Sequence, residues 1–458
     1  MNVLDKDLKN EVLLEITPTQ EEIKELKILV NKFRDIIYDS AKKLDYTINI
    51  ELGGSYAKNT FLRGDFDVDF FIQFEPNVED SKKEKMLIEI LHYSNIQFNI
   101  KHGSRVYVSG FFSDSSLNNF LKNNSKQKVS GFNFECVPTE ICNNVKFAKN
   151  STDVSIFHVK YLQNNSNKDA NLVNEIRLTK KWFKTKHLYG AESYINGFSG
   201  HSIECLIMKF KSFENLIIFM SSMNKNQILE IDSVLNSKIS FPKDKQSPLM
   251  MKDPILEGRN TLSALNEELF YRAKYYAIKH LVEGFEKKDF ICCETNKNIE
   301  ELESDFFQEK MDHLGIKYTF SKTELSRDIL GSKLLKLTKK ISKFLNEYGF
   351  NVLDIHFKIY EEENCAFAKI IIESSILPKQ YLTKAISLDV LQKHIMKFLE
   401  IHKNSELKII NNYIYLEKER NFSNLEEFSN LYLSNKNNFK NKLDMEEFSF
   451  VNNIYFRI

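Results

Sequence analysis

The segment that most constrains this chain is residues 53–74, GGSYAKNTFLRGDFDVDFFIQF. It joins a Gly-Gly-Ser turn and a short basic stretch to an apolar run that is dense enough for a buried strand. Two acids interrupt that run, Asp67 and Asp69, and they project from the same side because side chains alternate along a strand. Like charges side by side are unfavourable unless a cation lies between them, so the segment predicts a strand with a cation site.

Magnesium is the cation that fits this pattern, because it binds carboxylate oxygens together with substrate phosphates. Just upstream, Gly53, Gly54 and Ser55 offer backbone N–H groups and a hydroxyl for a phosphate. Together these parts predict Mg²⁺-assisted phosphoryl or nucleotidyl transfer. A solvated strand end is the plainer alternative for the acids alone. A calcium loop is excluded, because its sixth and twelfth positions would be Phe70 and Pro76.

A third carboxylate on a neighbouring strand would complete a two-metal site. Residues 131–137, GFNFECV, form a short β-prone run that Pro138 closes, and the run contains one acid, Glu135. Taken alone, Glu135 could simply be a surface residue of an edge strand. Beside the first segment, we expect it to be the third ligand.

Three segments resemble one known family. Residues 54–74 resemble the head-domain signature of the archaeal-type (class I) CCA-adding enzymes, tRNA nucleotidyltransferases of the polymerase-β-like superfamily. Residues 174–207, NEIRLTKKWFKTKHLYGAESYINGFSGHSIECLI, resemble that family's central segment almost continuously. Residues 253–260, DPILEGRN, are similar to its Asp-Pro…Arg-Asn element, and the three segments come in the family's order.

The resemblance implies a role for each matching residue. Asp67 and Asp69 match the metal-binding pair, and Glu135, where the family usually has Asp, would help to activate the 3′-hydroxyl of the RNA. The remaining matches imply contacts to the nucleotide: Ser55 and Lys58 (often Arg in the family), Lys180 and Tyr189 on the triphosphate, Ser155 in place of a Thr, and Arg259 on the incoming base. Without the resemblance, the plainer interpretation is that Lys180 is a solvated lysine, Tyr189 packs at a helix end and Arg259 is a surface arginine.

The predicted fold class is α+β and multidomain. A length of 458 residues is consistent with about three domains. We predict a polymerase-β-like nucleotidyltransferase head at residues 1–150, a mainly helical central nucleotide-binding domain at 151–290, and an α+β, RRM-like body and tail that binds tRNA at 291–458. The RRM-like assignment rests on fold analogy with the family.

Periodicity and turn residues predict several elements. A helix over 19–45 begins with Thr19 and Glu22 as a capping box, and a second helix covers 174–188. Strands within 47–137 are expected to form the catalytic sheet. In the C-terminal part we predict a hairpin of 352–360 and 365–373, a helix over 384–402, and β-structure at 407–416 and 448–456.

One further pattern concerns four lysines of a predicted helix. Leu334, Leu337, Ile341 and Phe344 make its apolar face, and the basic residues that lie along another face are Lys333, Lys336, Lys340 and Lys343. An ordinary solvated face is one explanation. A row of contacts to RNA phosphates is the other.

Composition bounds the class of protein without selecting it. The net charge of +1 neither favours nor excludes nucleic acid, because charged surfaces can be segregated. The six cysteines lack zinc-finger or redox spacing, which is typical of reduced thiols in a cytosolic protein. Residues 1–22 lack the basic start and apolar core of a signal peptide, and no apolar run approaches the roughly 18 residues of a spanning helix. We therefore expect a cytoplasmic protein with no membrane segment.

The sequence thus predicts, through the resemblance, an enzyme that adds C, C and A to tRNA 3′ ends from CTP and ATP, with Mg²⁺ and without a nucleic-acid template. Its expected partners are tRNA and the two nucleotides, and a homodimer is compatible with the pattern. One alternative is a poly(A) polymerase or another RNA 3′-terminal nucleotidyltransferase. A catalytically inactive RNA-binding protein would be expected to lose Asp67 or Asp69, and a small-molecule-modifying enzyme would not need the long C-terminal half.

Overall fold

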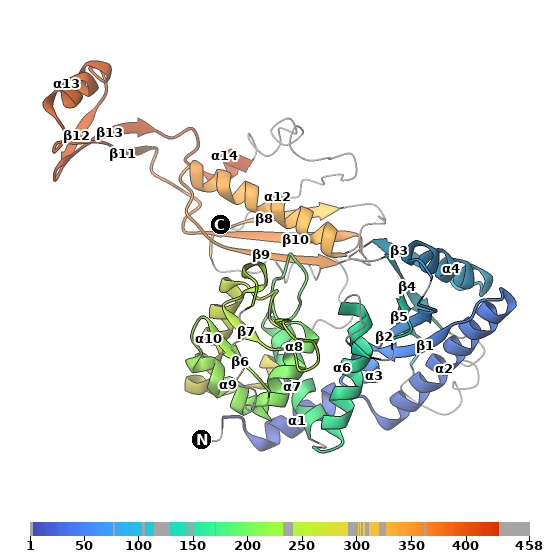
Figure 1. Ribbon diagram of the computed structural model, residues 1–458. Coiled ribbons are helices and arrows are strands. Elements are labelled where there is room, and N and C mark those ends of the chain that lie inside the picture. Colours follow the sequence, from blue (N-terminus) through green and yellow to red (C-terminus); the bar gives the residue numbers. More distant parts are fainter. Residues whose placement is uncertain are drawn as a thin grey trace. The chain divides into compact units, whose positions relative to one another are not determined.

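The computed structural model describes residues 3–429, apart from 77, 103–105, 114–128, 143, 146–150, 170, 232–240, 292–300, 302, 304–305, 307–310, 320–326 and 361–362. The chain forms two compact units, residues 1–293 with 324–329 and residues 294–323 with 330–458 (Figure 1). Within the described ranges, no helix is both long and apolar enough to cross a membrane.

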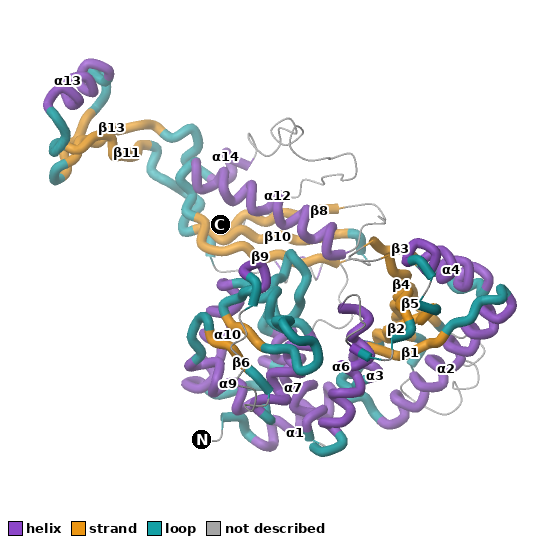
Figure 2. The backbone as a smooth tube through the Cα atoms, viewed as in Figure 1, coloured by secondary structure: helices purple, strands orange, loops and turns teal. Residues whose placement is uncertain are grey.

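A five-stranded sheet forms the N-terminal half of the first unit (Figure 2). Its strands are β1 (Asn49–Gly53), β2 (Asp67–Phe74), β3 (Asn99–His102), β4 (Val106–Phe112) and β5 (Phe132–Glu140), in the order β1-β2-β5-β4-β3. The pair β2–β5 is parallel and the other pairs are antiparallel. The predicted sheet within residues 47–137 is therefore confirmed.

Two helices, α2 (Gln20–Lys43) and α4 (Asp80–Tyr93), pack with this sheet around one hydrophobic core. The predicted capping box starts α2: the Thr19 hydroxyl accepts the Glu22 N–H at 3.1 Å, and the Glu22 carboxylate accepts the Thr19 N–H at 2.7 Å. At the centre, the ring of Phe33 lies 4.7 Å from that of Phe70 and 4.8 Å from that of Phe134, between ring centroids. This core fixes β2 and β5, the strands that carry the predicted ligands.

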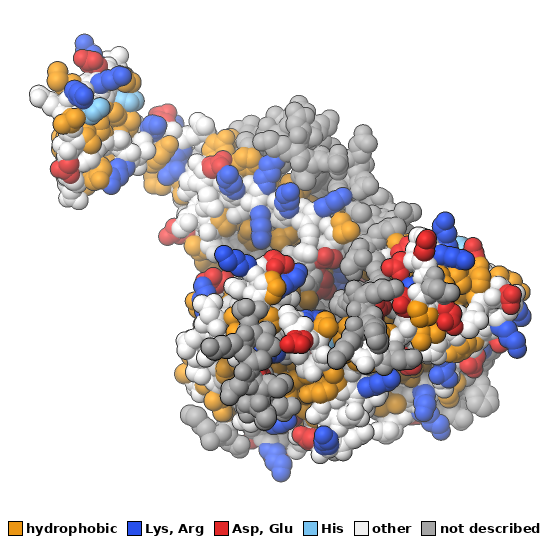
Figure 3. All heavy atoms as spheres, viewed as in Figure 1, with side chains coloured by type: hydrophobic (Ala, Val, Ile, Leu, Met, Phe, Trp, Pro, Cys, Tyr) orange, Lys and Arg blue, Asp and Glu red, His pale blue; other side chains and the backbone are white. Residues whose placement is uncertain are grey.

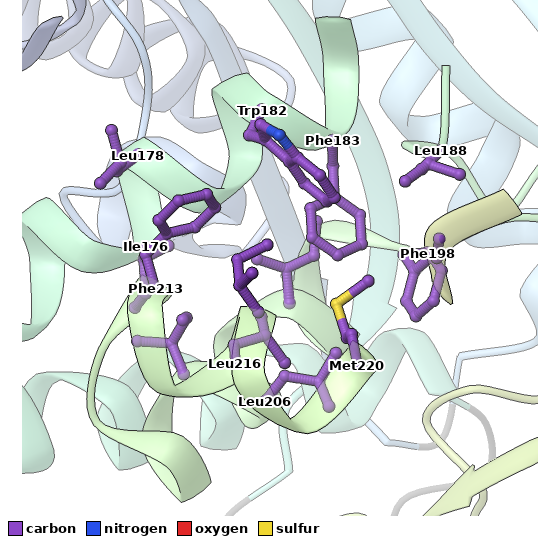
Figure 4. Close-up of a cluster of buried hydrophobic side chains, with 14 of the residues drawn as sticks. Ile176, Leu178, Trp182, Phe183, Leu188, Phe198, Leu206, Phe213, Leu216 and Met220 are labelled. Atoms are coloured by element: carbon purple, nitrogen blue, oxygen red, sulfur yellow. The ribbon is translucent and has the colours of Figure 1, made fainter. Parts of the chain in front are cut away.

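A second core of the same unit is largely helical. It is built by α1 (Lys6–Ile16), α6 (Ser151–Ser166), α7 (Leu172–Thr185), α8 (Gly200–Phe210), α9 (Phe213–Ser222) and α10 (Glu267–Glu283), with a short parallel pair, β6 (Gln227–Leu229) and β7 (Leu249–Met251). Figure 4 shows Trp182 and Phe183 of α7 among Phe198, Phe213 and their neighbours. Although α1 precedes the sheet in the chain, it packs against α7.

The second unit contains two antiparallel sheets. One has the order β8-β10-β9, formed by β8 (His313–Thr319), β9 (Val352–Tyr360) and β10 (Cys365–Ile372). The other has the order β11-β13-β12, formed by β11 (Gln380–Ser387), β12 (Leu407–Ile410) and β13 (Tyr413–Glu419). Among the helices that the described residues of this unit form are α12 (Arg327–Glu347), α13 (Gln392–Ile401) and α14 (Leu425–Phe428).

Two C-terminal predictions need correction and one is confirmed. The hairpin of β9 and β10 is confirmed. The helix predicted over 384–402 is wrong at its start, because Lys384 to Ser387 continue β11 against β13 and the helix begins only at Gln392. The β-segment at 407–416 is two strands, which turn at Asn411 with φ 56°. The strand predicted at 448–456 lies outside the described residues.

Candidate active site

The predicted carboxylates lie on two adjacent parallel strands of the sheet. Asp67 and Asp69 are at the start of β2, and Asp69 is paired in register with Gly53 of β1 on one side and Glu135 of β5 on the other. Asp67 pairs with Asn133, which hydrogen-bonds its carboxylate. The prediction that Glu135 sits on the strand beside the two aspartates is confirmed. Its role as a ligand stays a prediction.

The Gly-Gly-Ser turn is shaped by its closeness to Asp69. Gly54 has φ 59°, a conformation that favours glycine, and it opens the short helix α3 (Gly54–Ala57) directly after β1. A Cβ atom on Gly54 would lie 1.7 Å from Oδ2 of Asp69, so no other residue fits there without moving that carboxylate. The turn therefore brings Ser55, in the first turn of α3, and Lys58, directly after α3, close to the strand that carries the acids.

The electrostatics at this edge fit a cation. Burial and, to a smaller extent, the charge of Asp67 raise the pKa of Asp69, Lys58 partly opposes them, and the resulting pKa is about 6. Burial also raises the pKa of Asp67, with Asp65 as the next cause. Neighbouring carboxylates whose charged forms are disfavoured are a donor set that a hard divalent ion would stabilise.

Helix α7 contacts the segment just before β2 through the side chain of Lys184. Its ammonium forms an ion pair with Asp65, two residues before Asp67. Burial raises the pKa of Asp65, but the Lys184 charge and hydrogen bond more than offset it and hold the pKa below its usual value. Nothing in the sequence marked Asp65 as a partner of Lys184, because the two residues lie 119 positions apart.

The two lysines that we predicted to bind the triphosphate, Lys58 and Lys180, contact the same carboxylate. Nζ of Lys58 lies 2.7 Å from Oε2 of Glu204, and Nζ of Lys180 lies 3.1 Å from Oε1 of the same residue. Lys180 also donates to the Thr60 hydroxyl at 2.8 Å. Because Lys180 is only 4% exposed, the alternative that it is an ordinary solvated lysine is wrong.

Tyr189 lies beside the same lysines. It follows a turn at His187, where φ is 55° and α7 has ended. Nζ of Lys184 is 5.2 Å from the centroid of the Tyr189 ring, and a Cβ on Gly200 would meet the Tyr189 hydroxyl at 3.0 Å. Burial raises the pKa of Tyr189, so its hydroxyl stays protonated and can donate.

Arg259 is held by a buried carboxylate from its own segment. Its Nη1 donates to Oδ2 of Asp253 at 3.1 Å, and Nε2 of His158 and of His201 lie 2.9 Å and 3.2 Å from the Asp253 oxygens. Burial lowers the pKa of His158 to about 4, so this ring is neutral near pH 7. The fourth predicted central residue, Ser155, is half-buried one helical turn before His158 on α6.

This histidine cluster does not have the character of a cation site. Among the described residues, His158, His201 and Asp253 bring three potential metal-binding atoms within 4.8 Å of one another. Asp253, however, already accepts hydrogen bonds from Arg259, from both histidines and from the N–H groups of Ile255 and Leu256. An arginine on the carboxylate repels a second cation, so we interpret the cluster as a hydrogen-bond network.

Family profiles match three successive parts of the chain. Residues 31–107 match a nucleotidyltransferase domain, residues 174–290 the second domain of tRNA nucleotidyltransferase, and residues 314–443 the C-terminal domain of the CCA-adding enzyme. A CCA-adding enzyme of Methanococcus maripaludis is 28% identical over 379 residues, which cover 80% of this chain and 78% of that protein. The chain belongs to the archaeal-type CCA-adding enzyme family. It is therefore a nucleotidyltransferase, and the predicted family and enzyme class are confirmed.

Other relatives agree with this assignment. The CCA-adding enzyme of Methanocaldococcus jannaschii is 27% identical, covering 79% of this chain and 76% of that protein, and that of Pyrococcus abyssi is 26% identical, covering 76% and 74%. Among solved structures, the Cid1 poly(U) polymerase has a TM-score of 0.45 at 12% identity, over 60% of this chain and 92% of that one. A likeness of that size carries no argument about function.

The lysine pattern of the C-terminal unit falls on α12. Leu334, Leu337 and Ile341 are buried, whereas Lys333, Lys336 and Lys343 are exposed. Lys340 is only partly exposed, and its Nζ lies 5.9 Å from the ring centroid of Phe344. Lys339, which the sequence pattern did not select, is exposed instead. Figure 3 shows Lys and Arg side chains over this helix.

Sequence reasoning missed the residues that hold the predicted ones in place. Glu204 and His201 lie one helical turn apart on α8, and Asp253 starts the segment whose arginine was predicted. The available signal was a glutamate flanked by apolar residues, IECLI within SGHSIECLI, because an acid that is buried there needs a partner. Which partner it finds, 146 residues away at Lys58, is set by tertiary structure alone.

Proposed function

We propose that this chain adds C, C and A to the 3′ end of tRNA from CTP and ATP, without a nucleic-acid template and with Mg²⁺ as its metal. The observation that carries the proposal is the convergence of two separate segments of the chain. The start of β2, with its two aspartates, lies beside Lys58, and Lys58 shares a buried carboxylate with Lys180 of α7. Acids for metal ions and cations for a triphosphate are the two parts that nucleotidyl transfer requires.

The proposed roles follow from charge and position. Asp67, Asp69 and Glu135 would hold the metal, which supplies a lower pKa for the 3′-hydroxyl and neutralises charge on the phosphates. Lys58, Lys180 and the Ser55 hydroxyl would bind triphosphate oxygens. The Tyr189 hydroxyl, which remains protonated, would donate to the same group.

The base would be read beside the lysine cluster, because His201 lies 3.2 Å from Asp253 and 3.8 Å from Glu204. Arg259 has donors in a rigid fork, and its side chain remains 32% exposed while Asp253 holds one nitrogen. We place Ser155 near the same nucleotide, because it shares a face of α6 with His158, which bonds Asp253. The rest of the proposal is a head at residues 1–150, a central domain at 151–290, and an RRM-like part within 291–458 that binds tRNA.

Three tRNA transcripts test the function directly. They end before CCA, after the first C, and after CC, and each is incubated with one labelled nucleotide at a time. We expect CTP to be used by the first two and ATP only by the third. Repeated ATP addition to every transcript would instead identify a poly(A) polymerase. Asp69→Asn, which keeps the size of the side chain and removes its charge, should lower incorporation of both nucleotides by at least ~100-fold.

A further inference from the structure

Glu204 of α8 stands at the centre of a buried charge cluster. It is 2% exposed, and its two oxygens serve different parts of the chain. Oε2 accepts from Lys58 at 2.7 Å, and Oε1 accepts from Lys180 and from the Thr60 hydroxyl, each at 3.1 Å. Because both lysines contact one carboxylate, their ammonium groups are held close together although like charges repel.

The cluster carries more positive than negative charge. Two ammonium groups share one carboxylate, and the ring of His201 lies 3.8 Å from Oε2 of Glu204. Lys184, one turn after Lys180 on α7, is already paired with Asp65. A buried ion cluster seldom adds stability compared with apolar residues of the same size, so stability alone does not account for this one. Two ammonium groups on one carboxylate, beside the proposed metal-binding acids of β2, are suited to a polyanion that arrives with its metal ion.

We propose that Glu204 is a positioning residue for the nucleotide triphosphate, holding Lys58 and Lys180 charged and side by side where the phosphates bind. The inference rests on the proposed function, in which these two lysines contact the triphosphate. Glu204 acts through the lysines and does not itself touch the nucleotide, whose charge would repel it.

Loss of the Glu204 carboxylate should lower the pKa of Lys180. Burial lowers the pKa of Lys180, as do the charges of Lys58 and Lys184, whereas Glu204 raises it. Without Glu204, Lys180 keeps the burial and the two repelling lysines and loses the charge that favours its ammonium form. Its pKa then falls further, so Lys180 is neutral at high pH and binds phosphate only when the pH is lowered.

The test measures equilibrium binding of CTP with Mg²⁺ to the full chain, without tRNA, between pH 7.5 and 9. Over this range the terminal phosphate, whose pKa is about 6, is ionised throughout. We expect the Kd of the wild type to change by less than ~2-fold and that of Glu204→Gln to rise by ~10-fold, because above its pKa the charged fraction of a lysine falls about tenfold for each pH unit. An equally flat profile for Glu204→Gln would overturn the proposal.

Glu175→Gln is the matched control. Glu175 of α7 is also fully buried and also pairs with a lysine, Lys9 at 2.6 Å, but it touches neither Lys58 nor Lys180. Its variant should be less stable and keep a flat profile. The double variant Lys180→Met/Glu204→Gln should bind CTP weakly at every pH, because the group that titrates is gone. A pH profile that survives in the double variant would contradict the assignment to Lys180.

If Glu204→Gln does not fold, Glu204→Asp tests the positioning role of Glu204 instead. It keeps the charge but is one methylene too short to reach both lysines, so KM for CTP should rise by ~10-fold with kcat within ~3-fold. An unchanged KM would overturn the positioning role. The proposed function fails separately: wild-type protein that binds CTP with a flat profile but adds no nucleotide to truncated tRNA would contradict the function and leave this result standing.

Discussion

At the scale of single residues, the site is defined by what lies next to Asp69. Gly54 leaves room for its carboxylate, Lys58 counters its charge, and Glu135 is its neighbour in register. The turn chemistry pointed to Gly54, and a β-prone run with a single acid pointed to Glu135. The role of Lys58 was implied by the family resemblance, and the register of Asp69 with Glu135 comes from the pairing of two strands far apart in the chain.

Glu135 stands where the resemblance implies an aspartate. Replacing it with Asp or with Ala distinguishes the effect of its negative charge from the effect of its side-chain length. Glu135→Asp should retain CTP incorporation within ~10-fold of the wild type, and Glu135→Ala should lose at least ~100-fold, because it would remove the proposed third metal ligand. Single-turnover incorporation measures both. Glu140→Gln, at the other end of β5, is the control for the strand, and an active Glu135→Ala enzyme would show that the third carboxylate is another residue.

Arg259 supports a prediction about selectivity. Asp253 fixes one of its nitrogens at 3.1 Å, so the guanidinium presents its remaining donors in one orientation. Arg259→Ala should raise the use of UTP and GTP relative to CTP by ~10-fold, as judged from ratios of kcat/KM. Arg272→Ala, whose arginine pairs with Glu268 on α10, should leave the ratios unchanged. A uniform loss of rate with all four nucleotides would point to a phosphate contact.

At the scale of elements, the structures that depend on local sequence were predictable, whereas those that depend on long-range contacts were not. The capping box at Thr19 and the β9–β10 hairpin were predictable, because their hydrogen bonds join residues near in sequence. The start of α13 was not, since Lys384 to Ser387 are extended only through pairing with β13, some thirty residues later. The same reason hid Glu204, whose burial between two lysines depends on how α8 meets α3.

The lysines of α12 give the prediction for this scale. If they lie on tRNA phosphates, each releases roughly one counterion on binding. Lys336→Gln/Lys343→Gln should weaken tRNA binding and make the slope of log K against log salt shallower by about one to two units. The matched control is Lys24→Gln/Lys27→Gln on the exposed face of α2. Identical slopes for the two double variants would mean that α12 only displays charge to solvent.

At the scale of the first unit, two cores have to be held in one arrangement for the site to exist. The sheet core supplies the carboxylates and the helical core supplies Lys180 and Tyr189. Arg177 of α7, one turn before Lys180, joins them: it is 4% exposed and donates to the backbone carbonyls of Phe61 at 3.0 Å and Asn59 at 2.7 Å. These carbonyls belong to the segment between α3 and β2, where Lys58 and Thr60 also lie.

Arg177→Met therefore tests whether this joint positions the site. The variant leaves two carbonyls without their charged donor, at a cost of about 3 kcal/mol, which lowers the Tm of the unit by roughly 5–10 °C. CTP binding should weaken as well, since Lys180 shares the helix with Arg177 and loses its alignment with Lys58. Arg272→Met removes an arginine of the same size from an exposed pair and should change Tm by no more than about 1 °C. A lowered Tm with unaltered CTP affinity would show that Arg177 stabilises the unit without aligning the two halves of the site.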